Sequence, residues 1–388
     1  MDFSNLQKRF PELYPSSGEG LVSAFAPGRV NLIGEHTDYN NGYVLPCAIS
    51  TGTWLLARKN DDGLLRFASL NFNDSAEIPI EDVSGKSRVN WVNYPLGVIN
   101  QLIAEGLKLS GLDLLFFGNI PNSAGLSSSA SIEVVTATLL NHVFGLGINK
   151  TEIVKLSQKA ENEFIGVNCG IMDQFAVTIN QKNHALFLNC RTLGYELVPL
   201  KLDGYRIVIL NTGKTRQLAE SKYNERVAEC ARAVQYLSTI KPISSLGELT
   251  FQEFVGFRHI IPDITIRKRA HHVVSENQRV LDAVNALKNN NLRLFGSLMN
   301  ASHNSLRYNY EVTGDELDTI VEAARNVDGV LGARMTGAGF GGCAVSIVDE
   351  QNVPLFIQQV AERYTRKTGL TPEFYVSETN HGAYIIQD

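Results

Sequence analysis

The chain has 388 residues, of which 44% are hydrophobic and 19% charged, with 35 basic and 40 acidic side chains. This length suits two domains and a large core that needs no disulfide or metal staple. A net charge of −5 supplies no global attraction to nucleic acid or to an anionic membrane, so we expect neither partner. No apolar run approaches the 18 or so residues of a spanning helix.

The predicted strands are short runs rich in Val, Ile, Leu and Phe, bounded by Gly, Asp or Asn. In chain order they are 21–26, 64–69, 112–117, 185–189, 205–211 and 343–348. Helices are predicted where apolar residues recur about every 3.6 positions. They are 129–144, 151–164, 215–238, 276–290, 292–307, 315–325 and 354–368. Ser127 to Ser129 can cap the first helix, and Gly145 follows its apolar run.

Strands dominate the first third of the chain and helices the middle, and the end is mixed. This order differs from the strict alternation of a doubly wound parallel sheet and favours an α+β fold. A domain boundary is expected near residue 200, after the polar stretch LNCRTLGYE, which gives domains 1–200 and 201–388.

The cysteines and the first residues bear on the compartment. The five cysteines are scattered and form no Cys-x-x-Cys pair, which is typical of a reduced protein without a disulfide framework. The start, MDFSNLQKRFPELYP, has early charges and no apolar segment, so it predicts no secretory signal. We expect a cytoplasmic monomer without an obligate protein partner.

Two glycine-containing segments resemble motifs of other enzyme classes, but the sequence context is wrong for both. Gly213-Lys214-Thr215 looks like the end of a P-loop, yet Val208 stands where the first glycine of that motif is required. Gly337–Gly342 fits GxGxxG, but the residues after it, CAVSIVDE, predict a strand instead of the helix of a dinucleotide site. We therefore expect neither a P-loop nor an NAD-binding Rossmann domain.

The first segment with chemical content is APGRVNLIGEHTDYNNG, Ala26 to Gly42. It places a Glu-His-Thr-Asp run in one short loop, so several hydrogen-bond donors and acceptors lie close together. Such a loop can pair with the hydroxyls of a sugar and reject an analogue with a displaced hydroxyl. Taken alone, the same residues also fit an ordinary solvated turn.

The second segment, PNSAGLSSSAS, runs from Pro121 to Ser131 into a predicted helix. Unpaired N–H groups at a helix N-terminus form an anion site, which suits nucleotide phosphates. The third segment, RMTGAGFGGCAV, has four glycines between Gly337 and Gly342, which permit close approach to a ligand or another loop. Alone, the second segment also fits a plain helix cap, and the third fits a tight hairpin.

In this order and spacing, the three segments resemble the three motifs of the GHMP small-molecule kinase superfamily, and GRVNLIGEHTDYN resembles the galactokinase signature. The resemblance extends over nearly the whole chain. It implies a two-domain fold, with an N-terminal domain like ribosomal protein S5 domain 2 and a C-terminal ferredoxin-like domain. It also implies ATP-dependent phosphorylation of α-D-galactose at the C1 hydroxyl, the first step of galactose catabolism.

The resemblance also implies roles for individual residues. Asp173 in NCGIMDQ is the expected catalytic carboxylate, and Arg29 is the cation that keeps it ionised and neutralises phosphoryl charge. The expected sugar ligands are Glu35, His36, Thr37, Asp38, Gly170 and Tyr223. Asp173 alone would also fit a helix cap, and Tyr223 alone an aromatic on a helix face.

The nucleotide and its metal ion are assigned in the same way. The expected ATP contacts are Ser69, Trp91, Tyr94 and the phosphate loop Ser123, Ala124, Gly125, Leu126, Ser127, Ser128 and Ser129. Ser129 and Glu161 are the expected Mg²⁺ ligands, because a hydroxyl and one carboxylate leave room for water and phosphate oxygens. Ala338 replaces a glycine common in relatives, which matters only if that position requires a positive φ.

Other functions stay open at this stage. The same scaffold could phosphorylate N-acetylgalactosamine or arabinose, or act as a galactose/ATP sensor without catalysis. The complete SSSAS stretch favours a working enzyme, because some sensor relatives have a shortened second motif.

Overall fold

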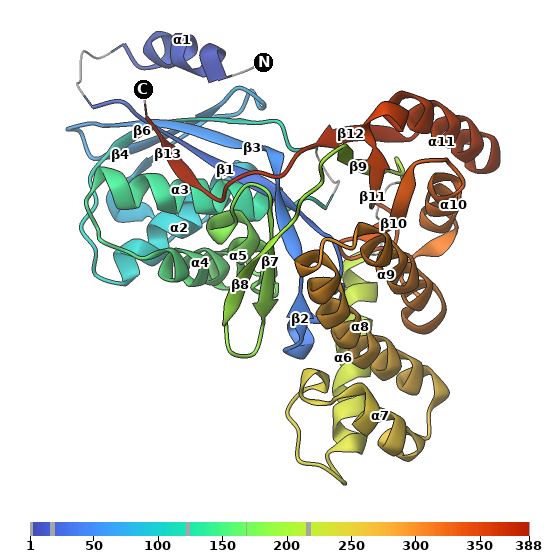
Figure 1. The fold of residues 1–388 in the computed structure, drawn as a ribbon. Coiled ribbons are helices and arrows are strands. Elements are labelled where there is room, and N and C mark those ends of the chain that lie inside the picture. The colour runs from blue at the N-terminus through green and yellow to red at the C-terminus, as the bar shows by residue number, and fades with distance from the viewer. Residues whose placement is uncertain (1–2, 16–19, 122–124, 168, 215–218, 388) are drawn as a thin grey trace.

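The computed structural model describes residues 3–15, 20–121, 125–167, 169–214 and 219–387, which form two lobes (Figure 1). The first lobe contains helices α1 (Phe3–Leu13), α2 (Asn93–Ala104), α3 (Ser128–Val143), α4 (Lys150–Lys159) and α5 (Met172–Ile179). Its strands are β1 (Val22–Asn31), β2 (Tyr43–Val44), β3 (Pro46–Lys59), β4 (Leu64–Ser69), β5 (Ala76–Pro79), β6 (Leu112–Gly118), β7 (His184–Asn189) and β8 (Tyr195–Pro199). The chain's last strand, β13 (Tyr384–Ile386), also joins this lobe.

The main sheet of the first lobe has the strand order β13-β1-β3-β6-β4-β5, in which only β4 and β6 pair in parallel. Helices α2 and α3 pack against one face, where their apolar side chains form a core with those of β3, β4 and β6. Helix α1 covers the opposite face through Leu6 and Phe10 (Figure 1). Because β13 pairs with β1, the last strand of the chain forms one edge of this sheet, next to the first strand.

The second lobe is built on an antiparallel sheet of order β10-β11-β9-β12. Its strands are β9 (Tyr205–Asn211), β10 (Val330–Thr336), β11 (Cys343–Asp349) and β12 (Glu373–Ser377). Its helices are α6 (Ala219–Leu237), α7 (Phe251–Phe257), α8 (Ile264–Lys288), α9 (Leu292–Ser305), α10 (Gly314–Arg325) and α11 (Val353–Thr368). The predicted boundary near residue 200 lies between β8 and β9, and it stays a prediction.

A separate core joins the two lobes. Val30 of β1 and Leu32, just after this strand, belong to the same buried cluster as Val345 and Ile347 of β11. The strands β2, β7 and β8 form a third, small sheet beside this core. The first predicted motif therefore lies where both lobes meet, and burial on both sides limits the positions that its residues can take.

All the predicted strands are present, and 64–69 and 205–211 have the predicted bounds. The long strand β3 was not predicted, because it is buried on both faces for much of its length and shows no clean alternation. Helix α8 begins at Ile264, well before the predicted start at 276, because the side chain of Asp263 caps it by accepting from the backbone N–H groups of Thr265 and Ile266. Helix 215–238 is seen from Ala219, and residues 215–218 lie outside the described part.

Two smaller expectations concern loops. Gly337–Gly342 lies between the antiparallel strands β10 and β11, which agrees with rejecting a dinucleotide fingerprint. Ala338 is not among the residues with a positive φ, so replacing glycine there costs nothing in backbone strain, whereas Phe340 has a φ of 57°. None of the five cysteines, which all lie in the described ranges, forms a disulfide. None of the helices in the described ranges is long and apolar enough to cross a membrane.

Candidate active site

The centre of the site is an ion pair between Arg29 of β1 and Asp173 of α5, which are 144 positions apart. Arg29 Nε donates to Asp173 Oδ1 at 2.8 Å, and Nη2 donates to Oδ2 at 2.7 Å. The Arg29 side chain is 7% exposed and that of Asp173 is 28% exposed. This bidentate pair fixes the orientation of the carboxylate while leaving it open to a ligand.

The second motif reaches the same pair. Arg29 Nη1 donates to the carbonyl of Gly125 at 2.7 Å, and the backbone N–H of Arg29 donates to the carbonyl of Leu126 at 3.1 Å. Ser127 Oγ donates to Asp173 Oδ2 at 2.6 Å. The prediction that Ser127 caps helix α3 with its side chain is therefore wrong: its φ is 62° and its hydroxyl turns to the carboxylate instead.

The first motif forms a tight loop after β1. A Cβ on Gly34, which has a φ of 97°, would stand 2.7 Å from the carbonyl of Tyr43, so only glycine fits there. Thr37 Oγ1 lies 2.8 Å from the carbonyl of Gly34 and 2.6 Å from that of Tyr43. Thr37 thus closes the loop and is the one expected sugar ligand whose side chain does not line the cavity described next.

A cavity of about 530 Å³ opens beside the ion pair. It is lined by the expected residues Arg29, Glu35, His36, Asp38, Glu161, Gly170, Asp173 and Tyr223, together with Gly337 and Ala338 of the third motif. Its walls come from both lobes, because Tyr223 belongs to α6 and Gly337 follows β10. We call it the sugar cavity below, because the expected sugar ligands line it.

Burial changes the protonation of groups in the sugar cavity. It raises the pKa of Asp38 to about 6, and the nearby charge of Asp173 adds to the effect. It lowers the pKa of His36 to about 3, so this imidazole is neutral at pH 7. His36 Nδ1 lies 2.9 Å from the hydroxyl of Tyr39, while its Nε2 is buried without a partner in the described residues. These groups suit neutral, hydroxyl-bearing ligands.

Gly170 and Asp38 show how close the walls are. A Cβ built on Gly170 would lie 2.1 Å from Asp38 Oδ2, so any side chain at this position would displace the carboxylate. The need for glycine at position 170 therefore follows from Asp38, although the two residues are far apart in sequence.

Glu161 lies where α4 gives way to a π-helical turn, Ala160–Ile165, a local distortion that often accompanies functional sites. It is 7% exposed, and burial raises its pKa. The nearby hydroxyl of Ser129 opposes this rise in pKa, and Gln174 Nε2 donates to Glu161 Oε2 at 2.7 Å. The two expected metal ligands thus lie near each other, and Gln174, which sequence reasoning missed, supports one of them.

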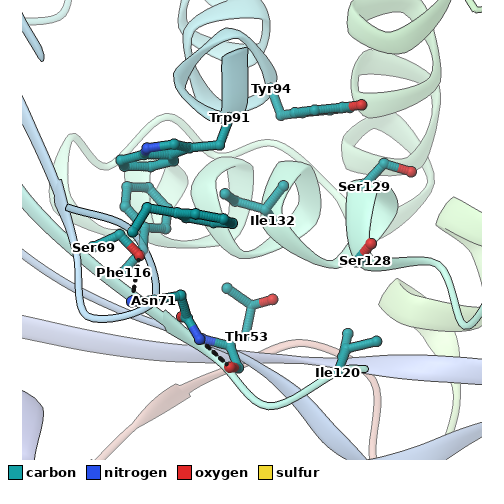
Figure 2. Close-up of a pocket in the computed structure, with 12 residues that line it drawn as sticks. Thr53, Ser69, Asn71, Trp91, Tyr94, Phe116, Ile120, Ser128, Ser129 and Ile132 are labelled. Atoms are coloured by element: carbon teal, nitrogen blue, oxygen red, sulfur yellow. Dashed lines mark hydrogen bonds between the residues drawn. The ribbon is translucent and has the colours of Figure 1, made fainter. Parts of the chain in front are cut away.

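A second cavity of about 230 Å³, which we call the aromatic cavity below, lies at the N-terminus of α3 (Figure 2). Its lining contains the expected Ser69, Trp91, Tyr94, Ser128 and Ser129. Sequence reasoning missed Asn71 and Phe72, which follow β4. The rings of Phe72 and Trp91 stack with centroids 6.1 Å apart, and Asn71 exchanges hydrogen bonds with the backbone of Gly118. The signal available in the sequence was an aromatic residue in the polar stretch NFND, soon after the predicted strand 64–69.

The phosphate loop is described only in part. Ser123 and Ala124 lie outside the described residues, and Gly125 to Ser129 lie between the two cavities. Within the described ranges, no three acidic, histidine or cysteine side chains converge as a cage that could hold a metal ion.

Known proteins resemble this chain over its whole length. Residues 8–59 match the galactokinase galactose-binding signature, 93–181 the GHMP kinases N-terminal domain and 283–366 the GHMP kinases C-terminal domain. A galactokinase of Clostridium beijerinckii is 51% identical over 98% of both chains. A galactokinase of Streptococcus thermophilus is 47% identical over the full length of both chains.

Solved structures agree on the fold. The crystal structure of Lactococcus lactis galactokinase complexed with galactose has a TM-score of 0.94 at 46% identity, covering 98% of this chain and 99% of that one. Mevalonate kinase of Methanococcus jannaschii has a TM-score of 0.69 at 19% identity over 93% of this chain and 99% of that one, which shows a shared fold only. The expected two-domain α+β fold is confirmed, and the chain belongs to the galactokinase family of GHMP kinases.

Proposed function

We propose that this protein transfers the γ-phosphoryl group of MgATP to the C1 hydroxyl of α-D-galactose, giving α-D-galactose 1-phosphate and ADP. The observation that carries the proposal is the cluster of Arg29, Ser127 and Asp173, which stands between a polar cavity and an aromatic cavity. The galactokinase relatives and the galactose complex of the Lactococcus lactis enzyme support galactose as the sugar.

The reaction needs a group that holds the attacking hydroxyl. Asp173 takes the C1 hydroxyl proton while that oxygen bonds to the γ-phosphorus and the bond from phosphorus to the ADP oxygen breaks. Arg29 holds the carboxylate in a bidentate ion pair and offsets negative charge near the phosphoryl group. In a loose transition state the hydroxyl gains little charge, so Asp173 also acts by orienting it.

The nucleotide fits the second cavity and the helix that separates the cavities. The rings of Trp91 and Phe72 offer a stacking surface for the base, and the N-terminus of α3 faces the place where phosphates would lie. Unpaired N–H groups at the start of a helix attract phosphate oxygens, so this placement directs the γ-phosphate toward the sugar cavity.

The residues present also fit a divalent cation. Ser129 and Glu161 offer a hydroxyl and a carboxylate oxygen, and both carboxylate oxygens of the buried Glu133 lack a partner in the described residues. Such a surplus of oxygen ligands without a closed cage suits Mg²⁺, which keeps waters and takes phosphate oxygens. Ser129 and Glu161 would hold the ion, and the bound ion would neutralise phosphate charge.

A coupled assay of ADP release with galactose, glucose, N-acetylgalactosamine and arabinose tests the proposal. We expect the highest kcat/KM for galactose and a product with phosphorus on C1 by ³¹P NMR. A higher kcat/KM for another sugar would show that galactose is not the preferred substrate. Ligand binding without any ADP release would favour a sensor instead.

A further inference from the structure

The third motif has no role in the chemistry above, although it contributes to the sugar cavity. Arg334 stands at its start, on β10 of the second lobe, and its side chain is fully buried. It is the largest side chain among the fully buried ones in the described residues. A buried guanidinium loses its hydration, so it is stable there only if a partner of opposite charge or a hydrogen-bond acceptor compensates for the loss.

The partners of Arg334 lie in the first motif, about 300 positions earlier. Nη1 donates to the carbonyl of Asn31 at 2.9 Å and to Glu35 Oε2 at 3.3 Å. Nε and Nη2 are buried without a partner in the described part of the chain. Glu35 is the only carboxylate that pairs with this guanidinium within 4 Å in the described ranges.

Glu35 is held by more than this pair. Its Oε1 accepts from the backbone N–H of Gly337 and lies 3.4 Å from Thr336 Oγ1, while Oε2 also accepts from Asn31 Nδ2. The carboxylate lines the sugar cavity and is 2% exposed. Burial raises the pKa of Glu35, and the nearby positive charge of Arg334 is the strongest opposing influence.

We infer that Arg334 is a positioning residue for sugar binding, which acts across the lobes by fixing the position and orientation of the Glu35 carboxylate. The inference rests on the proposed function, because it concerns the affinity for the sugar. Arg334 does not line either cavity, so its effect on the sugar passes through Glu35 and the loop that carries it.

Replacing Arg334 with methionine keeps most of the volume and removes the charge. For R334M we expect the galactose KM to rise roughly 10- to 100-fold, as for other losses of positioning, with a much smaller change in kcat and in the KM for ATP. Calorimetry with galactose in the absence of nucleotide should show the same loss of affinity. Unchanged galactose affinity in a folded R334M would overturn the inference.

A double-mutant cycle separates positioning from a general structural role. If Arg334 acts through Glu35, galactose should bind to the E35Q/R334M variant within about twofold of the weaker single variant, because the two changes remove one interaction. If the two losses of affinity multiply, Arg334 acts independently of Glu35, and the inference is wrong. If R334M does not fold, R334K takes its place in the cycle, with the same criterion.

Arg325 offers a matched control. It also anchors β10, since its Nε and Nη2 donate to the carbonyl of Ala333, but its contacts lie within the second lobe. R325M should lower the thermal stability without changing the galactose affinity of the folded protein, and an equal loss of affinity would overturn the inference. If the unaltered protein does not bind galactose, the proposed function itself fails, which the same titration shows.

Discussion

The sugar cavity and the aromatic cavity differ in the groups that they offer to a ligand. In the sugar cavity, Glu35, Asp173 and His36 are already bonded to protein partners. In the aromatic cavity, Trp91 and Phe72 offer ring faces. Leaving a buried polar group without a hydrogen-bond partner costs more binding free energy than removing one contact with the face of an aromatic ring. Changes in the first cavity should therefore have the larger effects.

The largest effect is expected at Asp173. D173N keeps the shape of the side chain but cannot take a proton, so kcat should fall by about 10²- to 10⁴-fold if Asp173 is the general base. Galactose affinity, measured by calorimetry, should change far less. Near-normal turnover with unchanged sugar affinity would remove the base assignment and leave a positioning role.

The next effect is expected at Asp38. D38N replaces a carboxylate acceptor by an amide, so the galactose KM should rise about 10- to 100-fold, while the KM for ATP stays close to that of the unaltered protein. Steady-state kinetics with each substrate varied in turn distinguishes the two. G170A should also raise the galactose KM and leave the KM for ATP unchanged, because its Cβ would displace Asp38. A rise in the KM for ATP of similar size would contradict the division between the cavities.

A smaller effect is expected in the aromatic cavity. W91A should raise the KM for ATP about five- to tenfold through the loss of stacking, without changing galactose affinity. The other of the two tryptophans, Trp54, packs against Phe117 outside both cavities, so W54F should leave the KM for ATP unchanged.

Trp91 is then the only tryptophan in the W54F variant, and ATP should change its fluorescence. An unchanged signal at saturating ATP would argue against this site for the base.

The smallest effect concerns pH. Since the pKa of Asp38 is raised to about 6 in the folded chain, sugar affinity should weaken as pH falls below about 6, where the carboxyl becomes protonated. The free energy of unfolding should depend on pH in the opposite direction. The folded chain binds this proton more tightly than the unfolded chain does, so the stability that protonated Asp38 contributes is lost as pH rises through about 6.

D38N removes this dependence, and calorimetric melting at two pH values tests it. The variant should melt about 2 °C or more above the unaltered protein at pH 7.5, and close to it at pH 4. A lower melting temperature at pH 7.5 would show that the ionised carboxylate stabilises the fold.

The polar and small residues of the motifs were accessible from sequence, because their types limit the chemistry that they can perform. The GEHTD loop, the serine-rich turn and NCGIMDQ contain most of the residues around the sugar cavity. The role of Ser127 was not accessible, since a serine before a helix usually caps it, and here tertiary contact with Asp173 wins over the local preference. Phe72 and Asn71 were missed because a short loop has no periodicity to signal its function.

By itself, the sequence determined the α+β class, the main elements and the family, since hydrophobic period and motif order are local properties of the chain. Tertiary structure decided which of these segments meet. The pairs Arg29–Asp173 and Arg334–Glu35 join residues that are 144 and 299 positions apart, and the buried core between the lobes brings them together. Distances of this kind depend on the packing of two lobes, which no local pattern encodes.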